Sequence, residues 1–320
     1  MANQVKGFTP EGVIPACLLP FKEDLTIDET AYRGHLQDVV NVEGISAITI
    51  NAHSTEVSSC SFEEQERVLA ITMDEVGSRI PVINGVFAAG SLEAARIARM
   101  AEKGGASCLL VFPPEPFSLG AHSRPEIALT HFKTIADATD LPIICFQYPL
   151  AGGLGYPIDT LLNIVDKVPT IKAIKDWCNN VVQHEQHIRI LQNLPRPVNV
   201  LTTHSAWLFS SLVLGCNGVL SGSGSVIADL QVELWQAVQA DDMVRARAAH
   251  ERIYPLAKSF YADPFIDMHN RMKQALTMLG RIPCAAVRPP LVTPRESDIA
   301  AIKKALEQSG VQRDGASVKI

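Results

Sequence analysis

The chain has 320 residues, of which 47% are hydrophobic and 19% are charged, and its formal net charge is −6 at pH 7. This size and composition are typical of one large globular domain and exclude a disordered chain. A negatively charged chain without a stripe of lysine and arginine lacks the field that nucleic acid binding requires, so we expect no nucleic acid partner.

No apolar stretch of the sequence approaches the length of a membrane span. The longest stretches, at residues 141–148 and 206–214, hold fewer than half of the roughly 20 residues that a span requires. Residues 1–10 also carry no apolar leader segment. We therefore expect a cytoplasmic protein with no membrane partner.

The seven cysteines are spread along the chain without a Cys-x-x-Cys pair. Their number is odd and several fall in apolar runs, so they are interpreted as small buried side chains. The sequence predicts neither a disulfide framework nor a zinc site, and we expect no metal and no cofactor.

Short apolar runs alternate with helical segments along the first two thirds of the chain. This alternation is typical of a parallel sheet built from βα units. Eight runs are predicted to be strands, at residues 13–20, 45–51, 81–86, 107–113, 141–149, 170–176, 198–204 and 218–224.

The segments between these runs carry helix signals. Asp28 precedes an amphipathic stretch, Ser61 and Glu64 form a capping box, and a helix that opens at Ser91 is predicted to stop at Gly104. Eight such βα units predict a closed (β/α)8 TIM barrel, an α/β fold.

The domain organisation follows from where the strands end. The barrel is predicted to span residues 1–228, and residues 229–320 carry helical patterns without strands. Because no Gly/Ser/Pro linker separates the two parts, we expect the second part to be a C-terminal helical extension packed on the barrel as one structural unit.

Lys175 ends the otherwise apolar run 170–176. In this fold the chemistry lies at the C-terminal ends of the strands. Burial there would lower the lysine pKa and make the amine a Schiff-base nucleophile toward a 2-oxo acid, whereas the alternative is a lysine that snorkels to solvent. Other polar residues at strand ends favour the catalytic interpretation; they are Asn51, His53, Ser54, Glu56, Gln147, Tyr148, Asp176, Thr202, Thr203, His204, Ser221 and Ser223.

The chain resembles the dihydrodipicolinate synthase and N-acetylneuraminate lyase family of class I pyruvate-dependent aldolases and dehydratases. The most specific match is Ile174-Lys175-Asp176, whose lysine forms the imine in that family. The resemblance implies a barrel, an imine at Lys175 and a homotetramer. Supporting matches lie at residues 12–15, 101–106, 215–221, 273–280 and 288–291.

The chain departs from the family pattern where the chemistry is done. The family's relay tyrosine on the fifth strand matches Phe146, which cannot transfer a proton, and the arginine that receives a second carboxylate matches Ala151. A Tyr-Tyr pair that serves a neighbouring subunit matches Pro114-Glu115. These differences speak against dihydrodipicolinate synthase activity in particular, but they do not remove the imine chemistry.

Two histidines are candidates to replace the missing relay. His53 and His204 both fall at strand ends, and an acid/base with a pKa near 7 is well matched to imine chemistry. The alternatives are a loop or capping histidine for His53 and a polar plug for His204. We predict His53 as the principal acid/base and His204 as the second choice.

The resemblance also suggests where the 2-oxo acid carboxylate binds. Hydroxyl and backbone amide donors supply hydrogen bonds without a further charge. The candidates are Ser54 and Thr55 after the second strand, and Leu220 and Ser221 on the eighth.

Three further patterns receive structural interpretations. The pair His184 and His187 lacks the spacing of a zinc protease and is read as part of a solvated helix. Trp177 is interpreted as packing at the barrel rim. Residues 267–273 mix charges at helical spacing and are interpreted as an interface or surface face, whereas the resemblance implies that this helix approaches the barrel mouth, so that His269 or Asn270 could reach the site.

The sequence therefore favours a Schiff-base lyase that acts on a small-molecule 2-oxo acid. It leaves open whether the reaction is pyruvate-type aldol cleavage or condensation, or dehydration of a 2-keto-3-deoxy sugar acid. The alternative function is a catalytically impaired barrel that binds an oxo acid as a sensor or partner subunit. A metal-dependent hydrolase is disfavoured because the first strand has no His-x-His pair.

Overall fold

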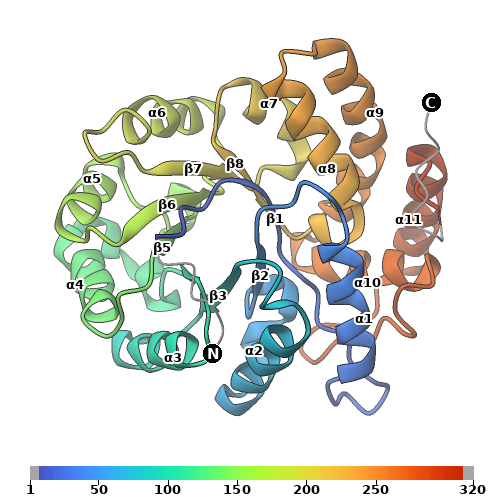
Figure 1. Cartoon of the computed structure of the whole chain (residues 1–320), viewed down its shortest axis with the longest axis horizontal. Helices are drawn as coiled ribbons and strands as arrows, with labels where there is room; N and C mark the ends of the chain where they lie inside the picture. The colour runs from blue at the N-terminus through green and yellow to red at the C-terminus, as the bar shows by residue number, and fades with distance from the viewer. Residues whose placement is uncertain (1–6, 313–320) are drawn as a thin grey trace.

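The computed structural model describes residues 7–312. Eight parallel strands form a barrel, in the order β1-β8-β7-β6-β5-β4-β3-β2, with helices around it (Figure 1). Backbone bridges from Val13 to Ile45 and from Ala16 to Thr49 join the first two strands. The strands are β1(Gly12–Pro15), β2(Ile48–Ile50), β3(Val82–Val86), β4(Cys108–Val111), β5(Ile143–Gln147), β6(Ile171–Asp176), β7(Asn199–Thr202) and β8(Gly218–Ser221).

Helices follow the strands and then continue beyond them. The three predicted starts and stops are confirmed: Asp28 caps α1, the Ser61–Glu64 capping box opens α2, and α3 ends before Gly104. The helices around the barrel are α1(Glu29–Val40), α2(Phe62–Val76), α3(Ser91–Lys103), α4(Pro125–Ala136), α5(Ile158–Lys167), α6(Val181–Leu191), α7(Leu208–Val213) and α8(Gly224–Gln239).

The C-terminal helices gather on one side of the barrel, beside α1 and α8 (Figure 1). They are α9(Met243–Phe260), α10(Met268–Met278) and α11(Glu296–Ser309). The stretch Gly224–Gln239 of α8 is kinked at Ile227, where φ is −132° and ψ is 43°, and the predicted boundary after residue 228 falls just beyond this kink. Residues 1–6 and 313–320, which belong to the two predicted parts, lie outside the described residues.

The predicted fold is confirmed, although the strands are shorter than the apolar runs. The run 13–20, for example, is a strand only over Gly12–Pro15. The buried segment that follows leaves the sheet, and its Leu18 amide donates to the Ser225 hydroxyl at 3.0 Å. A continuous apolar run does not distinguish a buried strand from the buried loop after it.

Successive residues of each strand point to opposite sides of the barrel wall. One hydrophobic cluster fills the barrel interior and includes Ile14, Ile144, Phe146, Ala173, Leu201 and Leu220. The other lies between the wall and the helices and includes Cys145, Ile174, Val200 and Val219. This alternation decides which polar residues at the strand ends can face the barrel mouth.

Among residues 7–312, the structure contains no helix with both the length and the apolar character needed to span a membrane.

Candidate active site

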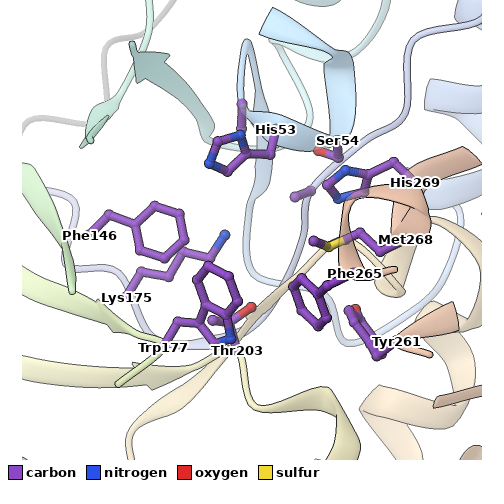
Figure 2. A pocket seen from close by; sticks show the side chains of 13 residues that line it. His53, Ser54, Phe146, Lys175, Trp177, Thr203, Tyr261, Phe265, Met268 and His269 are labelled. Carbon is purple, nitrogen blue, oxygen red and sulfur yellow. The ribbon is translucent and has the colours of Figure 1, made fainter. Parts of the chain in front are cut away.

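A pocket opens at the C-terminal end of the barrel, where the polar strand ends were predicted to meet. Figure 2 shows Lys175 projecting into it from β6, with His53 and Ser54 on one side and residues of the C-terminal extension on the other. The lining residues are Ala16, Ala52, His53, Ser54, Phe146, Lys175, Trp177, Thr203, Gly222, Tyr261, Phe265, Met268 and His269.

Lys175 is the charged side chain at the centre of this pocket. It is only 7% exposed, and burial lowers its pKa to about 7. Its Nζ lies 4.2 Å from the centre of the Phe146 ring, at the position where the family has its tyrosine. A free amine is therefore abundant at neutral pH, as nucleophilic attack on a carbonyl requires.

His53 lies beside Lys175 and has a partner that sequence reasoning missed. Its Nε2 forms a short hydrogen bond with the hydroxyl of Tyr148. Burial and the nearby Lys175 charge lower the His53 pKa to about 3, and burial raises that of Tyr148. At neutral pH the pair is therefore a neutral imidazole hydrogen-bonded to a neutral phenol, and the lowered pKa makes His53 a weaker base than the imidazole with a pKa near 7 that the sequence led us to expect.

Ser54 and Thr55, predicted to hold the carboxylate, have different surroundings. The Ser54 hydroxyl lines the pocket, is buried, and has no hydrogen-bond partner among the described residues. The Thr55 hydroxyl accepts from the Ala52 amide at 2.7 Å and donates to the Ala52 carbonyl at 2.8 Å. Ser54 is therefore free to bind a ligand, whereas Thr55 shapes the turn that presents it.

The turn that carries His53 and Ser54, the 3₁₀ helix η1(His53–Thr55), is held at its start by unusual backbone geometry. Asn51 has a φ of 50°. Its side-chain amide nitrogen, Nδ2, donates to the Gln65 carbonyl at 2.9 Å and to Asn84 Oδ1 at 2.8 Å. Gly85 allows this approach, because a Cβ there would lie 1.9 Å from the Asn51 carbonyl oxygen. Such conformations persist when the surroundings fix them, often at functional sites.

The end of the same turn is fixed by a buried ion pair. Glu56 has a φ of 52°, and its carboxylate contacts Lys273 Nζ of α10 and accepts from the Arg288 amide at 2.9 Å. Arg288 in turn makes a double hydrogen bond to Glu64, at 2.6 and 2.8 Å. The C-terminal extension thus holds the loop that positions His53 and Ser54.

We expect Lys273→Met to lower the free energy of unfolding by about 3–5 kcal/mol, because it leaves the buried Glu56 carboxylate without its partner. Chemical denaturation monitored by circular dichroism measures the change. The double variant Glu56→Gln/Lys273→Met should recover part of the loss. Arg189→Ala, which breaks an exposed pair with Glu185, is the matched control and should change stability little. A Lys273→Met protein as stable as the wild type would contradict this role.

Residues 9–309 match the sequence model of the Dihydrodipicolinate synthetase family. The chain belongs to this family. It is 28% identical over 316 residues to a 4-hydroxy-tetrahydrodipicolinate synthase of Methanopyrus kandleri, which covers 97% of this chain and 99% of that protein. It is 24% identical to YagE of Escherichia coli K12, named as a candidate 2-dehydro-3-deoxy-D-gluconate aldolase, over 93% of this chain and 96% of that protein.

Solved structures in the family share the fold. The structure of YagE in complex with pyruvate has a TM-score of 0.85 at 23% identity, covering 93% of this chain and 98% of that one. Dihydrodipicolinate synthase of Thermotoga maritima has a TM-score of 0.85 at 24% identity, covering 95% and 100%. The predicted resemblance is confirmed, and the protein is a class I lyase of the lysine-imine type.

The structure does not bring the other predicted residues of this family member to the pocket. His204 lies outside the barrel wall, where its Nε2 accepts the Asn179 amide at 3.1 Å and its ring stacks on Trp207. Leu220 packs in the barrel interior without lining the pocket. Ser221 hydrogen-bonds the Ser205 hydroxyl at 2.7 Å, on the outer side of the wall.

A second polar cluster lies behind Lys175, around the buried Asp176. Asp176 hydrogen-bonds Nδ1 of His184 at 2.8 Å and Nδ1 of His187 at 2.7 Å, and these bonds hold the pKa of its carboxyl far below the usual range. His184 and His187 are fully buried, so the expected solvated helix face is wrong at these two positions. Ligand atoms of Asp176, Cys178 and His204 lie within 4.8 Å of one another, and each already has a protein hydrogen-bond partner.

The C-terminal extension contributes more of the pocket than the sequence indicated. Tyr261, Phe265, Met268 and His269 all line it (Figure 2). Burial lowers the His269 pKa well below its usual value, and the charges of nearby groups lower it further. Asn270 instead donates to Asp267 and to the Val292 carbonyl, both at 3.0 Å. Only for His269 did the sequence carry a signal, through the family helix that approaches the barrel mouth.

Proposed function

We propose that the protein is a pyruvate-dependent aldolase in which Lys175 forms an imine with C2 of a 2-oxo acid. The observation that carries the proposal is the buried Lys175 amine, with a pKa of about 7, in a pocket that also holds the neutral His53 and the unpaired Ser54 hydroxyl. Lys175 supplies the nucleophile, His53 the proton acceptor, and Ser54 a hydrogen-bond donor for the substrate carboxylate.

The proposed cleavage follows from these roles. The Lys175 amine attacks the C2 carbonyl, and loss of water leaves a protonated imine while Ser54 holds the carboxylate. The His53 imidazole accepts the proton of the C4 hydroxyl, the C3–C4 bond breaks, and its electron pair moves toward the imine nitrogen as an aldehyde leaves. The His53 imidazolium then gives its proton to C3 of the resulting enamine, and addition of water to the imine releases pyruvate and the free amine. Condensation is the reverse sequence.

Tyr148 is proposed to replace the family's missing tyrosine within this scheme. Phe146 carries no hydroxyl, but Tyr148, two residues later and just past the end of β5, reaches His53 with its hydroxyl. A neutral imidazole can accept the C4 hydroxyl proton, whereas loss of a hydroxyl group needs an acid, and a His53 with a pKa of about 3 carries no extra proton at neutral pH, which favours aldol cleavage over dehydration.

A screen of 2-oxo acids and 2-keto-3-deoxy sugar acids tests the proposal. Pyruvate release is measured with a lactate dehydrogenase coupled assay, and borohydride trapping with intact-mass analysis reports the imine. Pyruvate and an aldehyde as products support the aldolase. A dehydrated oxo acid in place of pyruvate overturns it in favour of dehydration, and an imine without turnover of any substrate points to an impaired binding barrel.

The initial rate of imine formation with pyruvate should rise about tenfold between pH 6 and pH 8 and level off above. Below pH 7 the Lys175 amine, with its pKa of about 7, is protonated and cannot attack. A lysine with its ordinary pKa near 10.4 would show a rise of about a hundredfold over the same range. Samples incubated at each pH and quenched into borohydride at one fixed pH give the rate. A hundredfold rise would contradict the lowered pKa.

We also propose that the protein assembles as a homotetramer in the cytoplasm, as the family resemblance implies. Because Pro114-Glu115 replaces the family's Tyr-Tyr pair, a neighbouring subunit would not complete the proton relay. Multi-angle light scattering at micromolar concentration should give four times the mass of one 34.7 kDa chain. A monomer at that concentration would exclude the tetramer.

A further inference from the structure

The outer part of the pocket is an aromatic wall. Trp177, two residues after Lys175 and just past the end of β6, stacks on Phe265 with ring centroids 5.1 Å apart and an angle of 15° between the planes. Tyr261 continues this wall from the end of α9, with its ring 5.8 Å from that of Phe265 (Figure 2). The Tyr148 ring also packs against Trp177, in a T-shaped arrangement with the two ring centroids 5.3 Å apart. A substrate that extends outward from Lys175 therefore meets ring faces and edges.

The same pocket offers no charged partner for the outer end of a substrate. Among its described lining residues, Lys175 is the only lysine, arginine, aspartate or glutamate, and the imine uses it. His53 and His269 are both neutral at pH 7, because burial lowers their pKa values. Ala151, at the position of the family's anion-binding arginine, is exposed and does not line the pocket.

These two features fix the chemistry of the distal group. A second carboxylate buried here would lose its hydration without gaining a cation, which is strongly unfavourable. A sugar chain would bring several hydroxyl groups, for which the outer lining offers the Thr203 and Tyr261 hydroxyls, His269 and the Trp177 indole N–H, and its remaining hydroxyls would face rings and Met268. An aromatic ring, in contrast, gains apolar burial and stacking or edge contacts with Trp177 and Phe265.

We propose that the distal half of the substrate is an uncharged aromatic group, so that the enzyme cleaves 4-aryl-4-hydroxy-2-oxo acids to pyruvate and an aryl aldehyde, or condenses the two. The inference rests on the proposed aldolase function. In the cleavage step the C3–C4 bond breaks, the C4 hydroxyl loses its proton to His53, and C4 leaves as the aldehyde carbon. Phe265 lies in the short 3₁₀ helix η7(Phe265–Asp267), and an incoming ring stacks on it or takes its place against Trp177.

Matched substrates test the inference with the wild-type protein. The first pair is 4-hydroxy-2-oxo-4-phenylbutanoate and its para-carboxyphenyl analogue, which differ by one charge at the distal end. The third substrate is 2-keto-3-deoxygluconate. We expect kcat/KM for the phenyl compound to exceed both others by at least about tenfold, since one lost apolar contact already gives 10–200-fold discrimination. A carboxyphenyl or sugar acid substrate that is used equally well overturns the inference.

The condensation direction gives an independent check. With pyruvate as the donor, benzaldehyde should be consumed at least about tenfold more efficiently than aspartate semialdehyde, which carries a carboxylate. The borohydride adduct of pyruvate at Lys175 tests the aldolase function separately from the aromatic preference. An adduct without aryl preference overturns the aromatic inference alone, whereas the absence of an adduct overturns the aldolase function and the inference with it.

Variants of the wall assign the preference to residues. Trp177→Ala should lower kcat/KM for the phenyl substrate by about ten- to a hundredfold, within the range of losing such contacts, and Trp177→Phe should restore most of it. Phe265→Arg should reverse the preference between the phenyl and carboxyphenyl compounds. Trp235→Phe, at a half-buried tryptophan on α8 that does not line the pocket, is the control and should leave all rates within twofold. A phenyl preference that survives both wall variants unchanged would refute the assignment to Trp177 and Phe265.

Discussion

Lys175→Ala is expected to remove both the borohydride adduct and all turnover above background. The side chain supplies the nitrogen of the imine, and no second amine lines the pocket in the part of the chain that the structure describes. Since enzymes accelerate their reactions by about 10⁶-fold or more, the expected loss in kcat is of that order. Intact-mass analysis after trapping, peptide mapping and the pyruvate-release assay measure it.

Lys172→Ala is the matched control, because Lys172 lies on the same strand but near its start, where it is only half-buried. It should leave trapping and turnover unchanged. Lys175→Arg should behave like Lys175→Ala, since a guanidinium stays protonated and cannot form the imine. An adduct that maps to Lys172, or that persists in Lys175→Ala, would show that the nucleophile has been misassigned.

His53→Ala should lower kcat by about 10²–10⁴-fold, the usual contribution of a general acid/base, while the adduct at Lys175 still forms. The reason is that imine formation needs only the amine and the carbonyl, whereas bond cleavage needs the proton acceptor. Tyr148→Phe should lower kcat in the same direction, because it removes the hydroxyl that bonds His53 Nε2. Single-turnover kinetics and trapping, run on the same samples, separate the two steps.

His204→Ala and His269→Ala are the comparison variants for this prediction. His204 stays our second choice from sequence, yet its ring lies outside the barrel wall, so its removal should affect kcat less than that of His53. His269 lines the pocket and makes a direct alternative. If His53→Ala keeps full turnover while one of the other two abolishes it, the acid/base role belongs to that histidine.

The fold could be predicted from the sequence because its signals are local. Capping residues such as Asp28 and Ser61 mark helix starts, and eight apolar runs alternate with helices. What the runs could not show is where a strand ends and a buried loop begins. Pro15 ends β1, although apolar residues continue to position 20, because after the single bridge from Ala16 to Thr49 the chain turns away, and the Leu18 amide bonds His35 of α1 and Ser225 of α8.

The site was predicted in part, and the strand alternation explains the division. Every second residue after the interior residue Ala173 also faces inward, which places Lys175 and Trp177 in the pocket. After the interior residue Leu201 the same spacing places Thr203 in the pocket and His204 on the outer side. A strand-end position alone therefore did not distinguish the side of the wall. The same count along β5 leads from Phe146 to Tyr148, which a position-by-position match to the family could not indicate.

The contribution of the C-terminal extension could not be predicted in the same way. Tyr261, Phe265 and Met268 reach the pocket because α9, η7 and α10 pack over the barrel mouth. That packing depends on contacts far apart in sequence, such as Glu56 with Lys273, which are separated by 217 positions. The sequence around Glu56 or Lys273 contains no local pattern that predicts their contact.

Lys175 and Asp176 are neighbours in the chain, carry opposite formal charges, and are both buried, yet they never pair. The barrel wall separates the two charges. The Asp176 carboxylate accepts hydrogen bonds from two imidazoles on the outer side, whereas burial lowers the pKa of the Lys175 amine on the inner side. An aspartate on the inner face would instead hold the lysine as an ammonium ion, which cannot attack a carbonyl. The alternation of side chains along β6 thus keeps the charge of Asp176 on the far side of the wall from the nucleophile, and His184 and His187 satisfy that carboxylate there by hydrogen bonds.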